Sequence, residues 1–262
     1  MTIQPISLES LMNHVDKVVV VTLTGARERQ DAISALLETH KLAFEFHEGR
    51  DGRDQSIDDL AQGGIYDPRA RAALHRAPLT PAEIGCAVSH RDVAQALLDS
   101  RDRRVLILED DVHLLRENLE HFSASIRAMP RDWNLAYLAY AAMNLRTPLS
   151  IRLKLLSYYP LAHMLGSARH EPTAIRRIYR RPLTTHWMHA GWFYGTLAYA
   201  IDRTAAEQIV QAQSPVRFES DFVLCHLVRF TRLKAICARY PVFDQRPDVP
   251  SVIGPRHSQA EA

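Results

Sequence analysis

The sequence is short of cysteine and glycine, and each shortage narrows the class of protein it can encode. Its three cysteines, Cys86, Cys225 and Cys237, are odd in number and widely spaced, with no Cys-x-x-Cys pair. This argues against a disulfide framework and a structural zinc site, and reduced thiols are typical of the cytosol. The 10 glycines form no Gly-x-Gly or P-loop pattern, which disfavours proteins that bind phosphate through a glycine-rich loop.

A targeting or membrane-spanning segment is not expected either. Residues 1–5 show no basic stretch followed by an apolar run, as a secretory signal would. The longest uncharged stretch, residues 182–201, contains threonines, histidines and glycines. That polarity predicts two short strands with a turn rather than a membrane span. We therefore expect a soluble, cytoplasmic protein.

The composition that remains is that of a globular α/β protein. The chain has 262 residues, of which 47% are hydrophobic and 24% charged, which suits a single domain over residues 1–262. The formal net charge is only +2, so no nucleic-acid partner is expected.

The first half of the sequence alternates strand and helix patterns. A β-branched apolar run at 17–23 predicts a strand buried on both faces, followed by a helix over 27–40 and a strand over 42–47. These three form a βαβ unit with a right-handed crossover. A charged segment over 49–77 predicts a long surface loop with one short helix.

A second unit of the same kind leads to an acidic cluster. Thr80 as N-cap, Pro81 at the first helical position and Glu83 in a capping box predict a helix that ends near Ser100. The strand Val105–Leu108 follows and runs directly into Glu109-Asp110-Asp111.

The remaining elements complete an open, mostly parallel α/β sheet flanked by helices. In such sheets ligands bind beyond the carboxyl ends of the strands, where the acidic cluster lies. The patterns predict a helix over 115–128, a strand over 133–139, strands around Gly195, helices over 204–213 and 218–233, and an irregular tail from Tyr240.

Three adjacent carboxylates, Glu109, Asp110 and Asp111, repel one another unless a cation or a helix N-terminus is near. Mg²⁺ and Mn²⁺ prefer carboxylate oxygens and keep positions open for phosphates. In an extended segment Glu109 and Asp111 point the same way and Asp110 the opposite way. The alternative is that Asp110 or Asp111 caps the next helix, and position alone leaves both interpretations open.

Five stretches, in this order, resemble glycosyltransferase family 25, the lipopolysaccharide-type galactosyltransferases that have collagen galactosyltransferases as relatives. Together they cover residues 17–233 apart from the loops. They are Val20–Leu23 with Arg27 and Arg29, Leu79–His90, Val105–Val112, Gly195–Ile201, and Glu219–Asp221.

The resemblance implies a GT-A-like (Rossmann-like) fold, a UDP-sugar donor, typically UDP-galactose, and inversion at the anomeric carbon. It also implies a saccharide or lipid-linked acceptor such as a lipopolysaccharide, lipooligosaccharide or other surface glycan. The acceptor hydroxyl attacks as the nucleoside diphosphate leaves. A divalent cation, Mn²⁺ or Mg²⁺, offsets the growing charge, and a carboxylate takes the proton.

On this resemblance Asp221 is the first choice for the catalytic base and Glu219 the second, the alternative being an N-cap at the helix start. Arg27 and Arg29 would hold the diphosphate or the nucleobase, because arginine suits bidentate phosphate contact. Cations at a helix N-terminus are otherwise unfavourable, which favours this role over a solvated first turn. Asp111 is the first choice of metal ligand.

Further donor-site candidates are less specific. Asp110 would support the metal or the donor, Glu109 the nucleotide side, and Ser89 and His90 the donor, although a lone histidine is more often packed than a ligand. The sequence does not rank His189, His226 and His257 as alternative metal ligands. The opening strand ends Thr22-Leu23-Thr24, where family members have Asn, Ser or Asp, so the contacts to uracil are in doubt.

Residues 151–181 are the most asymmetric part of the chain, with seven Arg or Lys and one acid. One interpretation is a solvated surface loop. The other, which we favour, is an excursion that docks on an anionic membrane, because leucines and tyrosines lie among the basic groups. A soluble enzyme would then work peripherally at the inner face of the inner membrane.

Two other functions use the same features. A metal-dependent nucleotidyltransferase or phosphohydrolase also needs clustered acids, although the missing glycine-rich loop weakens the first. A catalytically silent glycan-binding homologue would keep the fold, but the intact acidic triplet argues against it.

Overall fold

A buried, β-branched run begins the central sheet of the computed structural model, which describes residues 7–140, 174 and 176–249. Strand β1 (Lys17–Thr22) is followed by helix α1 (Arg27–Thr39) and strand β2 (Glu45–Glu48). The two strands are parallel, with Val20 opposite Phe46. The predicted βαβ unit is therefore confirmed.

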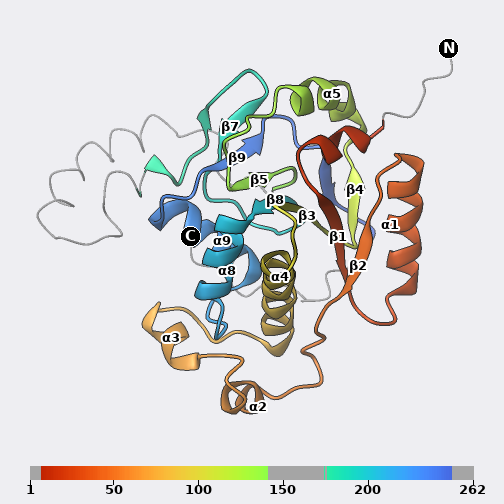
Figure 1. The fold of residues 1–262 in the computed structure, drawn as a ribbon. Helices are drawn as coiled ribbons and strands as arrows, with labels where there is room; N and C mark the ends of the chain where they lie inside the picture. Colours follow the sequence, from red (N-terminus) through yellow and green to blue (C-terminus); the bar gives the residue numbers. More distant parts are fainter. Residues whose placement is uncertain (1–6, 141–173, 175, 250–262) are drawn as a thin grey trace, which may run out of the picture.

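Eight strands form the main sheet, in the order β2-β1-β3-β8-β5-β9-β7-β6 (Figure 1). Only β8 and β7 run against the others within the described part of the chain, since they pair antiparallel with their neighbours. The structure therefore confirms the predicted GT-A-like α/β fold with a mostly parallel sheet. The further strands are β3 (Arg104–Glu109), β8 (Ala198–Asp202), β5 (Leu135–Tyr137), β9 (Ala235–Ala238), β7 (Trp187–His189) and β6 (Arg181–Pro182).

Helices cover both faces of this sheet. Helices α4 (Pro81–Asp99), α8 (Arg203–Ala212) and α9 (Ser220–Phe230) pack side by side on one face (Figure 1). The other face carries α1, η1 (Glu9–Asn13), α5 (Leu119–Arg127) and a two-stranded sheet of β4 (Val112–Leu114) and β10 (Phe243–Gln245).

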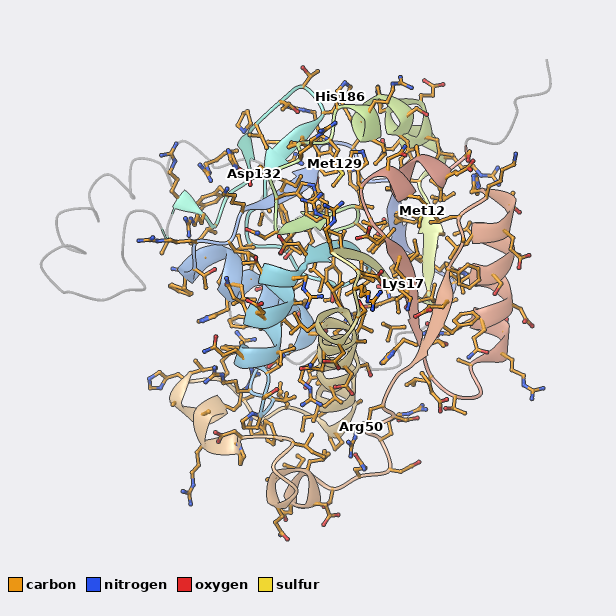
Figure 2. All side chains as sticks on the ribbon, viewed as in Figure 1. Met12, Lys17, Arg50, Met129, Asp132 and His186 are labelled. Atoms are coloured by element: carbon orange, nitrogen blue, oxygen red, sulfur yellow. The ribbon has the colours of Figure 1, made fainter. Side chains whose placement is uncertain are left out.

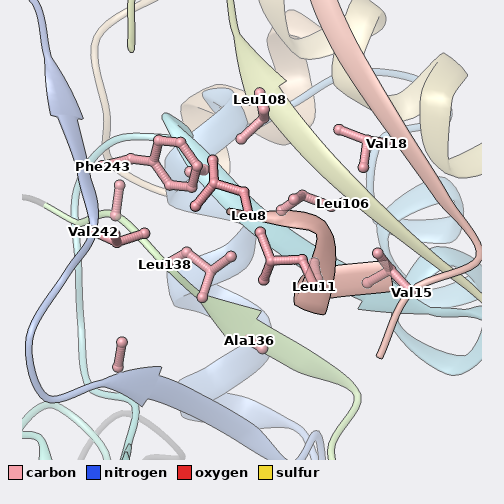
Figure 3. Close-up of a cluster of buried hydrophobic side chains, with 14 of the residues drawn as sticks. Leu8, Leu11, Val15, Val18, Leu106, Leu108, Ala136, Leu138, Val242 and Phe243 are labelled. Atoms are coloured by element: carbon pink, nitrogen blue, oxygen red, sulfur yellow. The ribbon is translucent and has the colours of Figure 1, made fainter. Parts of the chain in front are cut away.

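Side chains of the central strands alternate between these two cores. On β3, Ile107 packs toward α4 and α8, whereas Leu106 and Leu108 join the opposite cluster with Leu8 and Phe243 (Figure 3). All three strand residues are fully buried. Each contributes about 1.5–3 kcal/mol of hydrophobic stabilisation, so both faces must be covered for the strand to persist.

Helix α4 begins as predicted. The Thr80 hydroxyl accepts from the Glu83 backbone N–H at 3.2 Å, and the Glu83 carboxylate accepts from the Thr80 N–H at 2.8 Å. This reciprocal capping box satisfies two of the four N–H groups that a helix start leaves without partners.

Three local predictions are wrong. Segment 49–77 holds two short helices, α2 (Ile57–Gln62) and α3 (Pro68–Ala73), rather than one. The predicted 115–128 helix is α5 alone, preceded by β4 and the 3₁₀ turn η2 (Arg116–Asn118), and the tail contains β10. Strands β4 and β10 form only because they pair with each other across more than a hundred residues.

The carboxyl ends of β1, β2 and β3 meet at one edge of the sheet. Figure 2 shows Arg50, on the loop after β2, at this edge, and Asp132, ahead of β5, at the opposite edge. Within the described residues, no helix is both long and apolar enough to cross a membrane. Residues 151–173 and 175 of the basic excursion lie outside the described part of the chain.

Candidate functional site at the carboxyl edge of the sheet

The acidic triplet, the loop after β1 and the turn before β8 come together at this edge. Val21 lies opposite Glu109 because β1 and β3 are parallel. Strand β8 is antiparallel, so it begins where β3 ends, and the Glu109 N–H donates to the Leu197 carbonyl at 2.9 Å. The topology therefore gathers two distant segments, the loop after β1 and the turn before β8, beside the acids.

Asp110 has its negative charge compensated within the protein. Its carboxylate accepts from the Thr22 hydroxyl at 2.7 Å and from Arg29 Nη1 at 2.8 Å, and the residue is only 6% exposed. Arg29 in the first turn of α1 is thus held by an acid of the turn after β3, which offsets the unfavourable helix-dipole position. Arg27, by contrast, is exposed at the first residue of α1.

Asp111 is the least satisfied acid of the triplet. Its Oδ2 atom accepts from Gln245 Nε2 at 3.0 Å and lies 3.8 Å from Arg29 Nη2. Its Oδ1 atom is buried and has no hydrogen-bond partner in the described structure. Burial, followed by the nearby charge of Glu109, raises the pKa of Asp111 to about 6. A buried acceptor with open lone pairs is what a bound cation requires.

Glu109 faces a different set of partners. The Thr196 hydroxyl donates to its carboxylate, and His90 Nε2 lies 3.5 Å from the same oxygen. Asp110 and Asp111 both reach Arg29, and the charge of Glu109 also acts on Asp111, so the shared direction of Glu109 and Asp111 stays a prediction. The strand ends at Glu109 and the next two residues form a turn, where strand alternation no longer applies.

His90 and Ser89 are both buried on α4. His90 Nδ1 lies 2.9 Å from the Tyr199 hydroxyl. Burial by itself lowers the pKa of His90, but Tyr199, Cys86 and Glu109 together raise it well above its ordinary value. Ser89 donates to the Gly85 carbonyl and accepts from the Arg50 N–H, both at 2.8 Å. The predicted donor contacts of these two residues remain predictions.

Ser89 takes part in a close approach between the loop after β2 and α4, which sequence reasoning missed. A Cβ on Gly52 would lie 1.8 Å from the Pro81 carbonyl oxygen, and one on Gly85 would lie 2.5 Å from the Arg50 carbonyl oxygen. Only glycine fits at such distances. The available signal was the spacing of Gly49 and Gly52 within a charged segment.

Glu219 is bound by arginines that the sequence analysis did not connect with it. Arg71 donates to both carboxylate oxygens, at 2.8 and 2.7 Å, and Arg76 donates at 3.0 Å. Burial alone would raise the pKa of Glu219, but the hydrogen bonds from Arg71, a backbone hydrogen bond and the charges of Arg71 and Arg76 lower it to about 2. A carboxylate with so low a pKa is a poor proton acceptor.

Asp221 lies in the first turn of α9 and is 2% exposed. Its carboxylate accepts from the Gly195 N–H at 3.0 Å. The helix begins at Ser220, with Glu219 in the N-cap position and without a side-chain cap bond. The alternative in which Ser220 or Asp221 is the N-cap is therefore wrong, and the role of Asp221 as base stays a prediction.

A chain of polar contacts joins the start of α9 to the acidic triplet. Cys86 Sγ donates to the Ser220 hydroxyl at 3.3 Å, which lies 3.3 Å from the Thr196 hydroxyl, the donor to Glu109. The two acidic segments that the sequence singled out thus belong to one connected site, through Ser220 and Thr196.

The fit of a divalent cation rests on Asp111. Within the described residues, no three His, Cys, Asp or Glu side chains converge as a ready-made metal cluster. His189 and His226 lie on β7 and α9, and His257 lies outside the described residues. The open Oδ1 atom of Asp111 and its hard oxygen chemistry nevertheless suit Mg²⁺ or Mn²⁺, with substrate phosphates and water completing the coordination.

The architecture defines an α/β protein with acids at the ligand-binding edge of its sheet, and comparison with known proteins supplies the family. A family model described as "Glycosyltransferase family 25 (LPS biosynthesis protein)" matches residues 15–224. The chain belongs to glycosyltransferase family 25, so the resemblance deduced from the sequence is confirmed.

Similar proteins include procollagen galactosyltransferases and a protein named as inactive. The chain is 24% identical over 201 residues to mouse procollagen galactosyltransferase 2, covering 75% of this chain and 28% of that protein. It is 27% identical over 137 residues to the human protein of the same name, covering 51% of this chain and 22% of that one. It is also 24% identical over 213 residues to human "Inactive glycosyltransferase 25 family member 3", covering 77% and 29%. The chain thus spans less than a third of these relatives' lengths.

Proposed function

We propose that this chain transfers a hexose, galactose first, from a UDP-sugar to a lipopolysaccharide, lipooligosaccharide or other surface-glycan acceptor, with inversion at the anomeric carbon. The observation that carries the proposal is Asp111, whose Oδ1 atom is buried without a partner at the carboxyl edge of the sheet. In a protein of this family, that atom is a natural position for the cation that accompanies a sugar nucleotide.

In this proposal Asp111 holds Mn²⁺ or Mg²⁺, with Asp110 as second candidate. The cation, when bound, offsets charge on the leaving diphosphate. Arg29 keeps Asp110 in place and lies close to Asp111, so it tempers the repulsion within the triplet. Arg27 is exposed at the start of α1 and would contact the diphosphate or the nucleobase. Glu109 would serve the nucleotide side.

Asp221 remains our choice for the base. Glu219 is disfavoured, because two arginines hold its pKa at about 2. Asp221 is 2% exposed and hydrogen-bonded to the Gly195 N–H, so the assignment requires the Gly195 turn to admit the acceptor. If an Asp221→Asn variant still transfers sugar at the wild-type rate, Asp221 is not the base.

The test is donor turnover. Purified protein is incubated with UDP-galactose, Mn²⁺ and a surface-glycan acceptor, and both UDP and glycosylated product are measured. Acceptor-dependent UDP release that EDTA abolishes and Mn²⁺ restores supports the proposal. Other phosphate products would point to a nucleotidyltransferase or phosphohydrolase instead.

A second candidate is a catalytically silent glycan-binding homologue. Arg29 forms an ion pair with Asp110 and lies 3.8 Å from Asp111. This favours the second candidate, because the arginine then supplies part of the positive charge that a metal ion would supply. The similar human protein named as inactive shows that the family contains members without activity. Thermal stabilisation by glycan without any UDP release would favour this alternative.

We also propose that the basic excursion at 151–181 makes peripheral contact with an anionic membrane from the cytoplasmic side. Its support is the sequence pattern of basic, leucine and tyrosine residues. Flotation with phosphatidylglycerol vesicles at low salt tests this contact, and equal flotation with neutral vesicles would contradict it.

A further inference from the structure

Three consecutive residues ahead of β8, Gly195, Thr196 and Leu197, contact both acidic segments of the site. The Gly195 N–H donates to the Asp221 carboxylate at 3.0 Å. The Leu197 carbonyl accepts from the Glu109 N–H at 2.9 Å. Asp221 belongs to α9 and Glu109 to β3, so the two acids are far apart in the sequence. The placement of one acid relative to the other therefore depends on this short segment.

Thr196 contacts both acidic segments with a single atom of its side chain, the hydroxyl oxygen. The hydroxyl donates to the Glu109 carboxylate, and it lies 3.3 Å from the hydroxyl of Ser220, the residue before Asp221. Thr196 is only 3% exposed and Ser220 only 6%, so water competes little for these contacts. A change at this one oxygen would therefore act on both acidic segments together.

The hydrogen bonds along this chain have one direction. A threonine hydroxyl has a single proton, and that of Thr196 goes to Glu109. Ser220 is therefore the donor in its contact with Thr196, and Ser220 in turn accepts from Cys86 Sγ at 3.3 Å. Hydrogen bonds in such a chain polarise and strengthen one another. The chain thus holds the start of α9 in a fixed relation to the end of β3.

Glu109 has a second contact that does not involve α9. His90 Nε2 on α4 lies 3.5 Å from Glu109 Oε1, the same oxygen that accepts from Thr196. His90 is itself held through Nδ1, which lies 2.9 Å from the Tyr199 hydroxyl. Loss of the Thr196 hydroxyl would thus leave Glu109 in contact with α4 but remove its side-chain link to the start of α9.

We propose that Thr196 is a positioning residue, whose hydroxyl fixes Glu109, the acid on the nucleotide side, relative to Asp221, the base. The inference rests on the proposed glycosyltransferase function. Sugar transfer requires the acceptor hydroxyl and the anomeric carbon of the donor to be aligned, and a displacement of about 1 Å can lower a rate about 100-fold. Thr196 touches neither substrate in this assignment and acts through its two partners.

Thr196→Val removes the hydroxyl and keeps the shape of the side chain. The backbone hydrogen bonds of Gly195 and Leu197 remain, so we expect kcat for acceptor-dependent UDP release to fall about tenfold rather than about 100-fold. The KM values for UDP-galactose and for the acceptor should each change less than about twofold, because the groups that bind the substrates are unchanged. Thr196→Ser restores a hydroxyl and should return kcat to within about twofold of wild type.

Thr231→Val is the matched control. Thr231 is half-buried at the other end of α9, where its hydroxyl donates to the Leu227 carbonyl at 2.7 Å and accepts from the Leu233 N–H at 3.1 Å. Both valine variants remove two side-chain contacts and should lower the melting temperature by similar amounts. Only Thr196→Val should lower kcat, whereas a purely structural role for Thr196 would leave the two variants alike in kcat.

A pair of double variants tests the link to α9. Ser220→Ala removes the same link from the α9 side and should lower kcat by a factor similar to that of Thr196→Val, so it keeps the test valid should Thr196→Val unfold. The kcat of Thr196→Val/Ser220→Ala should lie within about twofold of the lower single variant, because the two hydroxyls form one link. Arg27, exposed at the start of α1, shares no described partner with Thr196. The losses of Arg27→Ala and Thr196→Val should therefore multiply.

Four results would overturn the positioning role while wild-type UDP release, and with it the proposed function, stands. They are an unchanged kcat in Thr196→Val, no recovery in Thr196→Ser, a change confined to the KM for the donor, and multiplied losses in the Thr196→Val/Ser220→Ala variant. No UDP release by the wild-type protein would instead remove the proposed function together with this inference.

Discussion

The two acidic segments of this protein have the same residue types and opposite environments. At the end of β3, Asp111 keeps a buried oxygen without a partner, and its pKa is raised to about 6. At the start of α9, Glu219 accepts from two arginines, and its pKa is lowered to about 2. A carboxylate whose charge is paired within the protein stabilises the fold, whereas a buried carboxylate oxygen without a partner is a candidate for ligand binding.

The comparison implies that neutralising Glu219 lowers stability, whereas neutralising Asp111 lowers activity. Glu219→Gln leaves Arg71, which is 3% exposed, buried beside a neutral partner. We expect this to lower the free energy of unfolding by about 3 kcal/mol, because breaking one side of a buried ion pair strands the other charge. Urea denaturation measures it.

The control for this variant is Asp248→Asn, which removes an exposed pair with Arg246. Exposed pairs contribute little to stability because solvent screens them, so this variant should unfold close to wild type. Equal losses in both variants would mean that the buried pair has no special weight.

The same pair predicts an acid-dependent stability. The pKa of Glu219 is lowered from 4.5 to about 2 in the folded protein. Its stabilising contribution is therefore complete above pH 4.5 and is lost as the pH falls toward 2. The difference in unfolding free energy between wild type and Glu219→Gln should shrink by about 3 kcal/mol across that range. A difference independent of pH would contradict the assigned cause.

Asp111→Asn should show the opposite pattern, with activity lost and stability kept. We expect UDP release to fall about 100-fold, equivalent to about 2.7 kcal/mol, because a neutral amide is a poor ligand for a hard cation. The melting temperature should not fall, since the variant removes a buried charge that lacks full compensation. Asp132→Asn, on an exposed residue paired with Lys234, is the control and should keep wild-type activity.

Sequence patterns predicted the elements whose conformation is fixed by neighbouring residues. The β-branched run of β1 and the Thr80 capping box predicted their elements closely, because few backbone conformations suit those residues. The location of the acidic triplet at the end of β3 was predictable for the same reason. Spacing alone left open whether the triplet is a metal site or a helix cap, and the family resemblance favoured the metal site.

Long-range pairing decided what the sequence patterns missed. Nothing near Glu219 in the sequence indicates Arg71, which lies 148 residues away. Arg71 reaches it because Tyr66, just before α3, pairs with Val216, just before α9. Strand β10 needs β4, and Gln245 on β10 is the partner of Asp111. Of the arginine pair, only the structure separates Arg29, held by Asp110, from the exposed Arg27.

The smallest predicted effect sharpens the comparison within the triplet. Thr22→Val keeps the shape of the side chain but removes the 2.7 Å hydrogen bond to Asp110. Because Arg29 still binds Asp110, we expect a loss of only about 1.5 kcal/mol in unfolding free energy. Activity should fall less than in Asp111→Asn, since in our proposal Asp110 positions the turn and Asp111 holds the cation. A loss of UDP release as large as that of Asp111→Asn would show instead that Asp110 is the principal ligand, and the distinction between the two neighbouring acids would have to be reversed.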